Sequence, residues 1–306
     1  YSYRIELIMK LVFGIYKYYF MQHLKIFIEL TRLNKPIGFM LLFWPCSWGL
    51  AYAYSMDQNL SLFLNYLILF FLGSVLMRSA GCIFNDIADK DFDRQVLRTK
   101  KRPIASGRIT IKLSFIYVLI LCFLAFLILI NFNFLTIVLG MSSMILAFSY
   151  PFMKRITYWP QLFLGITFNW GIIMSWSAIN DSISTEIIIL YVSAIFWTLG
   201  YDTIYGAQDM SDDEIIGLKS TSIKFKKNIK LFLSSAYIIV ILLNLYLFKN
   251  YLGLNIFSII FLLFCATLVY QLLKFDKNKS KKYLNLFKIN NYSGLLLFLG
   301  IFTINI

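Results

Sequence analysis

Segment 113–131 (LSFIYVLILCFLAFLILIN) contains no charged residue along its whole length. A helix that crosses the hydrocarbon core of a bilayer needs about 20 predominantly apolar residues, and several other runs in the chain resemble this one. Hydrophobic residues make up 59% of the sequence and charged residues 14%, against roughly 25% charged in an average soluble domain. A soluble all-α protein with very apolar helices does not account for runs of this length. The sequence therefore predicts an integral membrane protein of the all-α class.

The apolar runs predict nine transmembrane helices in one bundle. Their expected ranges are 36–56, 59–77, 113–131, 134–153, 158–180, 187–206, 231–248, 252–273 and 289–306. No linker rich in proline, glycine or serine divides them, so we expect a single transmembrane domain over 32–306. Residues 1–31 mix apolar, aromatic and basic residues without a clean apolar centre, which favours an amphipathic segment on the membrane surface over a cleavable signal.

The basic residues gather in alternate loops. Lysine and arginine are concentrated in 81–112, 207–230, 274–288 and the short turn 154–157, whereas the opposite set of loops holds only Lys249. The positive-inside rule then places the N-terminus in the cytoplasm and the C-terminus on the other side. This distribution also accounts for the net charge of +14, so membrane orientation explains the charge better than nucleic-acid binding does.

The four cysteines are scattered through or beside apolar stretches, where cysteine usually behaves as a small hydrophobic residue. They are Cys46, Cys82, Cys122 and Cys265, and no pair has the spacing of metal ligands. We expect neither a disulfide nor a zinc site, and we interpret the single His23 as incidental.

Nine of the fifteen acidic residues fall in two short windows, each at the cytoplasmic end of a predicted span. If the helices continue into these windows, each window places three polar groups on one helical face. These groups are Asn85, Asp89 and Asp93 in the first window and Asp202, Asp209 and Asp213 in the second. A solvated acidic loop is the alternative for either window alone. Two windows at equivalent places favour a shared ligand.

Stacked carboxylates repel one another, and burying a carboxylate near a span costs about 2–3 kcal/mol. A cation between them removes both costs, and oxygen ligands from Asp and Asn suit Mg²⁺, which shares itself with substrate phosphates. Basic residues follow both windows, as a diphosphate–metal complex requires. They are Arg94, Arg98, Lys101 and Arg102 after the first and Lys219 after the second. Positive-inside bias alone would also explain most of them. The compact pair Lys154 and Arg155, predicted in a short loop, is the stronger candidate.

Two stretches resemble the signatures of the UbiA-type intramembrane prenyltransferases. The first is 78–93 (RSAGCIFNDIADKDFD) with Arg102-Pro103 beyond it, and the second is 201–213 (YDTIYGAQDMSDD) followed by 217–221 (GLKST). Within that family the chain is most similar to the 4-hydroxybenzoate polyprenyltransferases of ubiquinone synthesis. The features that carry this closer resemblance are 32–38 (RLNKPIG), Trp44-Pro45, 150–155 (YPFMKR) and 290–294 (NNYSG).

The resemblance implies a central cavity capped by the two cytoplasmic loops. It implies Mg²⁺ bound by Asn85, Asp89, Asp93, Asp209 and Asp213, and a polyprenyl diphosphate held by Arg94, Arg98, Arg102, Lys154, Arg155 and Lys219. The acceptor 4-hydroxybenzoate would receive the prenyl group on the ring carbon ortho to its phenol. Its carboxylate would meet Arg32, Lys35 or Arg78, and residues with catalytic roles would be Asp86, Asp202, Lys154 and Arg155.

Two other functions are compatible with parts of the pattern. A cation transporter also carries intramembrane carboxylates, but here they lie at the ends of spans instead of mid-span. The same prenyl transfer to a naphthoate, a homogentisate or haem would use the same two windows. The richness in Ile, Lys, Asn and Phe is compatible with a bacterial plasma membrane protein from an AT-rich genome, and the mitochondrial inner membrane is the alternative location.

Overall fold

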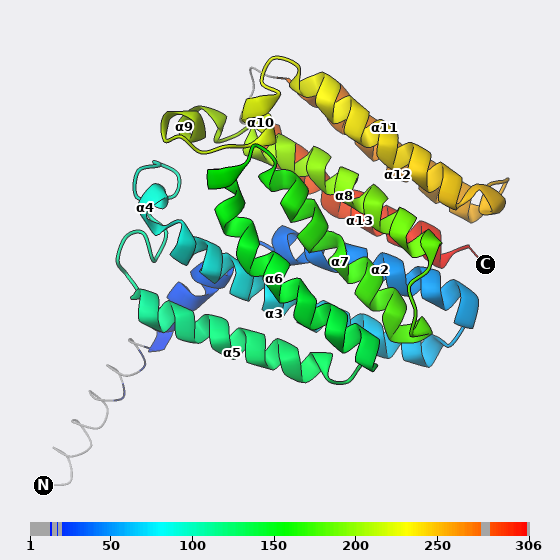
Figure 1. Cartoon of the computed structure of the whole chain (residues 1–306), viewed down its shortest axis with the longest axis horizontal. Coiled ribbons are helices and arrows are strands. Elements are labelled where there is room, and N and C mark those ends of the chain that lie inside the picture. The colour runs from blue at the N-terminus through cyan, green and yellow to red at the C-terminus, as the bar shows by residue number, and fades with distance from the viewer. Residues whose placement is uncertain (1–12, 14–16, 18–19, 277–281, 305–306) are drawn as a thin grey trace, which may run out of the picture.

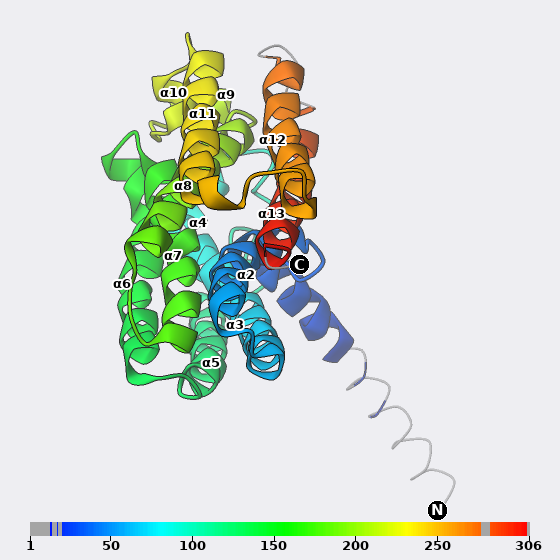
Figure 2. The same cartoon turned by 90° about the vertical axis from the view of Figure 1, so that its right-hand side faces the viewer.

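The computed structural model describes residues 20–276 and 282–304, together with Phe13 and Lys17. Within these residues the secondary structure is helical. The long helices are α2 (Ile37–Asp57), α3 (Leu60–Ala88), α5 (Ile111–Leu129), α6 (Phe134–Ile156), α7 (Pro160–Asn180), α8 (Thr185–Gly206), α11 (Ile229–Leu247), α12 (Ile256–Lys274) and α13 (Tyr283–Phe302). They run roughly parallel or antiparallel to one another (Figures 1 and 2).

The prediction of an all-α membrane bundle is confirmed, since eight of these helices are long and apolar enough to cross a membrane. The ninth, α13, is a helix of 20 residues that does not reach the mean hydropathy of these eight over a membrane-spanning length. Residues 20–31 are also helical, and the predicted surface segment before residue 20 falls largely outside the described residues.

Helices α2 and α8 form the buried centre of the bundle, and each packs against α7 and α13. Membrane helices associate through small residues that let backbones approach, because lipid is as apolar as leucine. Gly49 of α2 shows this, since an ideal Cβ there would lie 2.5 Å from the carbonyl oxygen of Ile172 on α7. Gly294 of α13 likewise leaves space that the indole of Trp44 fills.

Three short helices gather at one end of the bundle, where Figure 1 shows them at the upper left. They are α4 (Lys90–Asp93), α9 (Met210–Ile215) and α10 (Thr221–Lys224). They lie in the two loops that carry the acidic windows, so residues more than 100 positions apart meet at this end.

Two predictions about the helices beside the site differ from the structure. Helix α6 continues to Ile156 with Pro151 inside it, so Lys154 and Arg155 occupy its last turn and not a loop. Helix α8 ends at Gly206, and a turn separates it from α9. Asp202, Asp209 and Asp213 therefore do not share one continuous helical face, and that part of the prediction is wrong.

A buried polar network ties α8, α11, α12 and α13 together. The side-chain oxygen Oδ1 of Asn290 accepts a hydrogen bond from Trp197 Nε1 at 2.9 Å, and Asn290 Nδ2 donates to Gln271 Oε1 at 2.9 Å. Gln271 Oε1 also accepts from the Tyr237 hydroxyl at 2.9 Å. Asn290 and Gln271 are fully buried, so the first asparagine of the NNYSG motif serves the helix packing.

We expect Asn290→Ala to lower the apparent melting temperature of the purified protein. The substitution leaves the Trp197 indole N–H and Gln271 without a buried partner, which costs about 1–3 kcal/mol. Thermal unfolding in detergent would measure the shift, with Asn285→Ala on an exposed face of the same helix as control. An equal shift in both variants would contradict this role for the network.

Candidate active site

The first acidic window sits where α3 ends and α4 begins. The helical hydrogen bonds continue through the junction, from Asp89 N to Asn85 O at 2.9 Å and from Asp93 N to Asp89 O at 2.8 Å. Asn85, Asp89 and Asp93 therefore keep the shared face that their spacing predicts. Asn85 Nδ2 donates to Asp89 Oδ2 at 3.1 Å, and the Asp89 side chain is 1% exposed.

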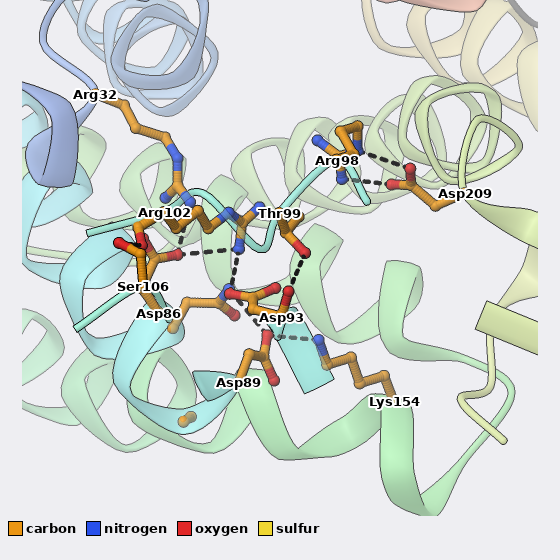
Figure 3. A network of polar contacts seen from close by, with 12 residues as sticks. Arg32, Asp86, Asp89, Asp93, Arg98, Thr99, Arg102, Ser106, Lys154 and Asp209 are labelled. Atoms are coloured by element: carbon orange, nitrogen blue, oxygen red, sulfur yellow. Dashed lines mark hydrogen bonds and ion pairs between the residues drawn. The ribbon is translucent and has the colours of Figure 1, made fainter. Parts of the chain in front are cut away.

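Cations surround this window (Figure 3). Lys154 Nζ donates to Asp89 Oδ2, and Arg102 Nη1 donates to Asp93 Oδ2 at 2.8 Å and to Asp86 Oδ1 at 3.1 Å. Asp86 also accepts from Arg32 Nη2 at 2.7 Å. Buried carboxylates require such partners, so the bases predicted to bind diphosphate are already held beside the carboxylates.

The second window reaches the same end through α9. Asp209 accepts two hydrogen bonds from Arg98, one from Nε at 2.8 Å and one from Nη2 at 2.5 Å, in the fork geometry that suits a guanidinium. Figure 3 shows this pair beside the network of the first window. Arg98 lies in the loop after α4, so the ion pair joins the two windows directly.

Burial and like charges act on the carboxyls outside the spans. Burial and the neighbouring charge of Asp209 raise the pKa of Asp213 to about 6, although Lys154 and Arg98 act in the opposite direction. Burial also raises the pKa of Asp93 above its ordinary value, while Arg102 acts in the opposite direction. A cation bound beside these two carboxyls would therefore stabilise their ionised forms.

Both windows line one cavity of about 1420 Å³. Seven of the predicted acidic or amide residues line it, namely Asn85, Asp86, Asp89, Asp93, Asp202, Asp209 and Asp213. The predicted bases on its wall are Arg32, Lys35, Arg78, Arg98, Arg102, Lys154 and Lys219. The structure thus brings together residues that the sequence spreads over nearly 190 positions, from Arg32 to Lys219.

Two predicted bases do not reach the cavity wall. Arg94 Nε donates to the carbonyl of Ala105 at 3.0 Å, which ties it to its own loop. Arg155 Nη2 donates to Ala88 O at 2.5 Å and lies 3.6 Å from Asp89 Oδ1, with its guanidinium stacked over Phe92. Arg155 therefore stabilises the junction of α3 and α4 through these contacts, without lining the cavity.

The three candidate acceptor-binding cations differ in their surroundings. Arg32 is paired with Asp86, and Lys35 is exposed at the mouth of the cavity. Arg78 lies deeper, 5.2 Å over the ring of Phe168, and its buried Nε has no hydrogen-bond partner among the described residues. Of the three, Arg78 has a buried donor nitrogen without a hydrogen-bond partner in the described residues, and this Nε lies beside Gly38 of α2.

Three polar side chains surround Arg78 in the apolar part of the site. Asp202, Tyr150 and Tyr201 each interact with its charge, and the buried Tyr201 hydroxyl also lacks a hydrogen-bond partner among the described residues. Neither tyrosine was predicted from the sequence to be a site residue. Their positions offered a signal, since Tyr150 lies one helical turn before Lys154 and Tyr201 directly precedes Asp202.

The residues fit a hard divalent cation. All candidate ligands supply oxygen, and Asp89 Oδ1 is buried without a hydrogen-bond partner in the described structure. The carboxylates are now held by arginine and lysine instead of converging on one point, so no group of three or more potential ligands forms a ready-made metal cluster in the described residues. The ion could be bound once the lysine and arginine side chains exchange these carboxylates for phosphate oxygens. The residues that could hold it are Asn85, Asp89, Asp93, Asp209 and Asp213.

Curated relatives are similar over most of the chain. The mitochondrial 4-hydroxybenzoate polyprenyltransferase of Rattus norvegicus is 41% identical over 277 residues, covering 90% of this chain and 73% of the rat protein. The enzyme of the same name from Arabidopsis thaliana is 46% identical over 217 residues, covering 71% of this chain and 53% of that protein.

Solved structures share the fold. A UbiA homologue from Aeropyrum pernix in its apo form has a TM-score of 0.71 and 24% identity, covering 86% of this chain and 96% of its own. A UbiA homologue from Archaeoglobus fulgidus, bound to GPP and Mg²⁺, has a TM-score of 0.61 and 15% identity over 90% of this chain and 99% of its own. The model of the UbiA prenyltransferase family matches residues 42–292. This chain therefore belongs to the UbiA prenyltransferase family.

Proposed function

We propose that this protein transfers a polyprenyl group from a polyprenyl diphosphate to 4-hydroxybenzoate, at the ring carbon ortho to the phenol, as in ubiquinone biosynthesis. The main support is a cavity lined by both acidic windows together with several lysine and arginine side chains. The chain that forms this cavity belongs to a prenyltransferase family. Relatives that are 40–46% identical and bear the name 4-hydroxybenzoate polyprenyltransferase support the choice of acceptor.

The donor's diphosphate would bind at the polar end. Lys154, Arg98 and Arg102 would exchange their present carboxylate partners for phosphate oxygens, and Lys219 would approach from the second window. Mg²⁺ held by the carboxylates would supply neutralisation of the leaving diphosphate. The C1–O bond then breaks, the diphosphate keeps the electron pair, and C1 gains carbocation character. Once bound to the phosphate oxygens, the lysine and arginine side chains would stabilise the negative charge that develops on the leaving diphosphate.

The acceptor would bind deeper, where the prenyl C1 emerges. Arg78 would hold its carboxylate, since this cation has an unpaired donor and lies against an aromatic ring. The side-chain carboxyl of Asp202 lines the cavity and makes no hydrogen bond within the described part of the chain, so it would orient or deprotonate the phenol. The ring carbon then bonds to C1, and its proton would pass to water or to the released diphosphate as the ring regains aromaticity.

We also propose that α13 crosses the bilayer as a ninth span, that residues 1–31 lie on the membrane surface before the transmembrane domain 32–306, and that the N-terminus is cytoplasmic. Support comes from α4, α9 and α10, which lie together at the end that carries the basic loops. The bacterial plasma membrane stays a prediction, and the mitochondrial location of the named relatives makes the inner mitochondrial membrane the alternative.

The assignment is tested by incubating the purified protein with Mg²⁺, radiolabelled 4-hydroxybenzoate and solanesyl diphosphate. We expect a labelled lipid-soluble product and release of one diphosphate per acceptor consumed. Parallel reactions with 1,4-dihydroxy-2-naphthoate and homogentisate serve as acceptor controls. Product with either of these and not with 4-hydroxybenzoate would overturn the acceptor, and release of diphosphate with no acceptor present would point to a different reaction.

A further inference from the structure

Two arginines contact the buried carboxylate of Asp86. Arg32 Nη2 donates to Asp86 Oδ1 at 2.7 Å, and Arg102 Nη1 donates to the same oxygen at 3.1 Å (Figure 3). The Asp86 side chain is 2% exposed, and a buried carboxylate needs a partner to remain ionised. One of the two arginines can therefore leave without exposing Asp86 to the cost of an unpaired buried charge.

Arg102 has two carboxylate partners, and the proposed donor binding removes it from both. Its Nη1 also donates to Asp93 Oδ2 at 2.8 Å, so binding a phosphate oxygen means breaking both contacts. Asp93 is among the residues proposed to hold the metal ion, whereas Asp86 is not. Without a second cation beside it, Asp86 would keep Arg102 in its present position, because a buried charge holds its remaining partner tightly.

Arg32 reaches Asp86 from an unusual backbone conformation. Its φ angle is +55°, in the left-handed region that residues other than glycine seldom adopt. The helix of residues 20–31 ends directly before Arg32, and the chain turns there, with Lys35 N donating to Arg32 O at 2.8 Å. Backbone strain of this kind persists where the surrounding structure enforces it, and it gathers at functional sites.

The helix of residues 20–31 packs against the loop that carries Arg102. Apolar side chains of both segments belong to one buried cluster, which includes Ile26 and Leu30 from the helix and Ile104 and Ile109 from the loop. On the outer side, Arg108 of the loop donates to both carboxylate oxygens of Glu29, at 2.8 and 2.7 Å. These contacts keep Arg32 in place while the side chain of Arg102 moves.

We infer that Arg32 is a positioning residue for donor binding, which neutralises Asp86 throughout the reaction and so releases Arg102 to the diphosphate. Arg32 itself contacts neither the donor nor the acceptor. This inference rests on the proposed function. It gives Asp86 the role of a fixed anion in place of a metal ligand or a proton acceptor.

The test is a double-mutant cycle on Arg32 and Asp86, measured as calorimetric binding of inorganic pyrophosphate in the presence of Mg²⁺. Arg32→Met in the otherwise wild-type protein should weaken this binding about tenfold, because Asp86 then retains Arg102. In the Asp86→Asn background the same replacement should change the affinity by no more than about twofold, since the anion that retains Arg102 is gone. In initial rates, Arg32→Met should raise the KM for solanesyl diphosphate and not the KM for 4-hydroxybenzoate.

Lys25→Met is the matched control. Lys25 is exposed on the same N-terminal helix and is not among the described residues that line the cavity. Its replacement changes the net charge equally and should leave the affinity for pyrophosphate within about twofold of wild type, as expected for an exposed charge.

Three results would overturn the inference. An equal loss of pyrophosphate affinity in both backgrounds would place Arg32 on the phosphate itself. A rise in the KM for 4-hydroxybenzoate alone would place it on the acceptor carboxylate. A loss of Mg²⁺ binding in Asp86→Asn as large as in Asp89→Ala would make Asp86 a metal ligand.

The same measurements separate this inference from the proposed function. Coupling between Arg32 and Asp86 in a protein that forms no product from 4-hydroxybenzoate would overturn the proposed reaction and leave the role of Arg32 at a diphosphate site intact. Product formation without coupling would overturn the inference alone. A wild-type protein that neither binds pyrophosphate nor forms product would overturn both.

Discussion

Replacing Asp89 with alanine is expected to lower turnover at least ~100-fold, because a metal-assisted departure of diphosphate is worth several kcal/mol. Asp89 is 1% exposed, is hydrogen-bonded to Asn85, and has one buried oxygen without a hydrogen-bond partner. Asp213→Ala, in the second window, should have a comparable effect. The measurement is kcat with saturating donor and acceptor, together with Mg²⁺ binding followed by calorimetry in detergent.

Asp91→Ala is the matched control for this change. It removes a carboxylate two residues away that is 84% exposed and lies only 3.7 Å from Arg94, so neither turnover nor Mg²⁺ affinity should change by more than about twofold, as expected at an exposed ion pair. Asp212→Ala plays the same part for Asp213. Near-normal activity in both Asp89→Ala and Asp213→Ala, with unchanged Mg²⁺ binding, would contradict the proposal that residues of both windows bind the metal.

Arg78→Leu is expected to reduce kcat/KM for 4-hydroxybenzoate about 10- to 100-fold, since a hydrogen bond to a charged group contributes about 1.5–3 kcal/mol. The KM for the prenyl diphosphate should change less, because the cations proposed to bind it contact Asp89, Asp93 and Asp209, and no ion pair within the described residues joins these carboxylates to Arg78. Initial rates measured while each substrate is varied separate the two effects.

Gly38 provides a second route to the same group. An ideal Cβ at Gly38 would lie 2.9 Å from Arg78 Nε, so Gly38→Val should displace the guanidinium and raise the acceptor KM in the same direction. Lys35→Gln is the control, because Lys35 is exposed at the mouth. A larger rise in acceptor KM for Lys35→Gln than for Arg78→Leu would move the carboxylate site from the interior to the mouth.

The polar end of the site was largely predictable, and particular residues show why. Asn85, Asp89 and Asp93 share a face in the structure because helical hydrogen bonds continue across the junction of α3 and α4, as their spacing predicts. For Asp202, Asp209 and Asp213 the same reasoning failed, since α8 ends at Gly206. Both windows still reach one cavity, because the lengths of the spans bring the loops to the same end.

The pairing of each charge could not be predicted. From the local sequence, Arg94 and Arg98 are equally good candidates to bind a phosphate. In the structure Arg98 contacts Asp209, 111 positions away, whereas Arg94 donates to the carbonyl of Ala105 in its own loop. Likewise the motifs that contain Tyr150 and Tyr201 do not show that both side chains lie near Arg78, which follows from the packing of α6 against α7 and of α8 against α7. Such contacts depend on side-chain directions in three dimensions.

The sequence by itself determined the solvent in which this chain folds and which ends of its helices carry charge. Run length and the distribution of lysine and arginine suffice for that, because the bilayer imposes one length and one charge bias on every span. Only the tertiary structure decided which cations contact which carboxylates and which polar side chains lie around Arg78. These contacts arise from the directions of side chains on neighbouring helices, which no local pattern encodes.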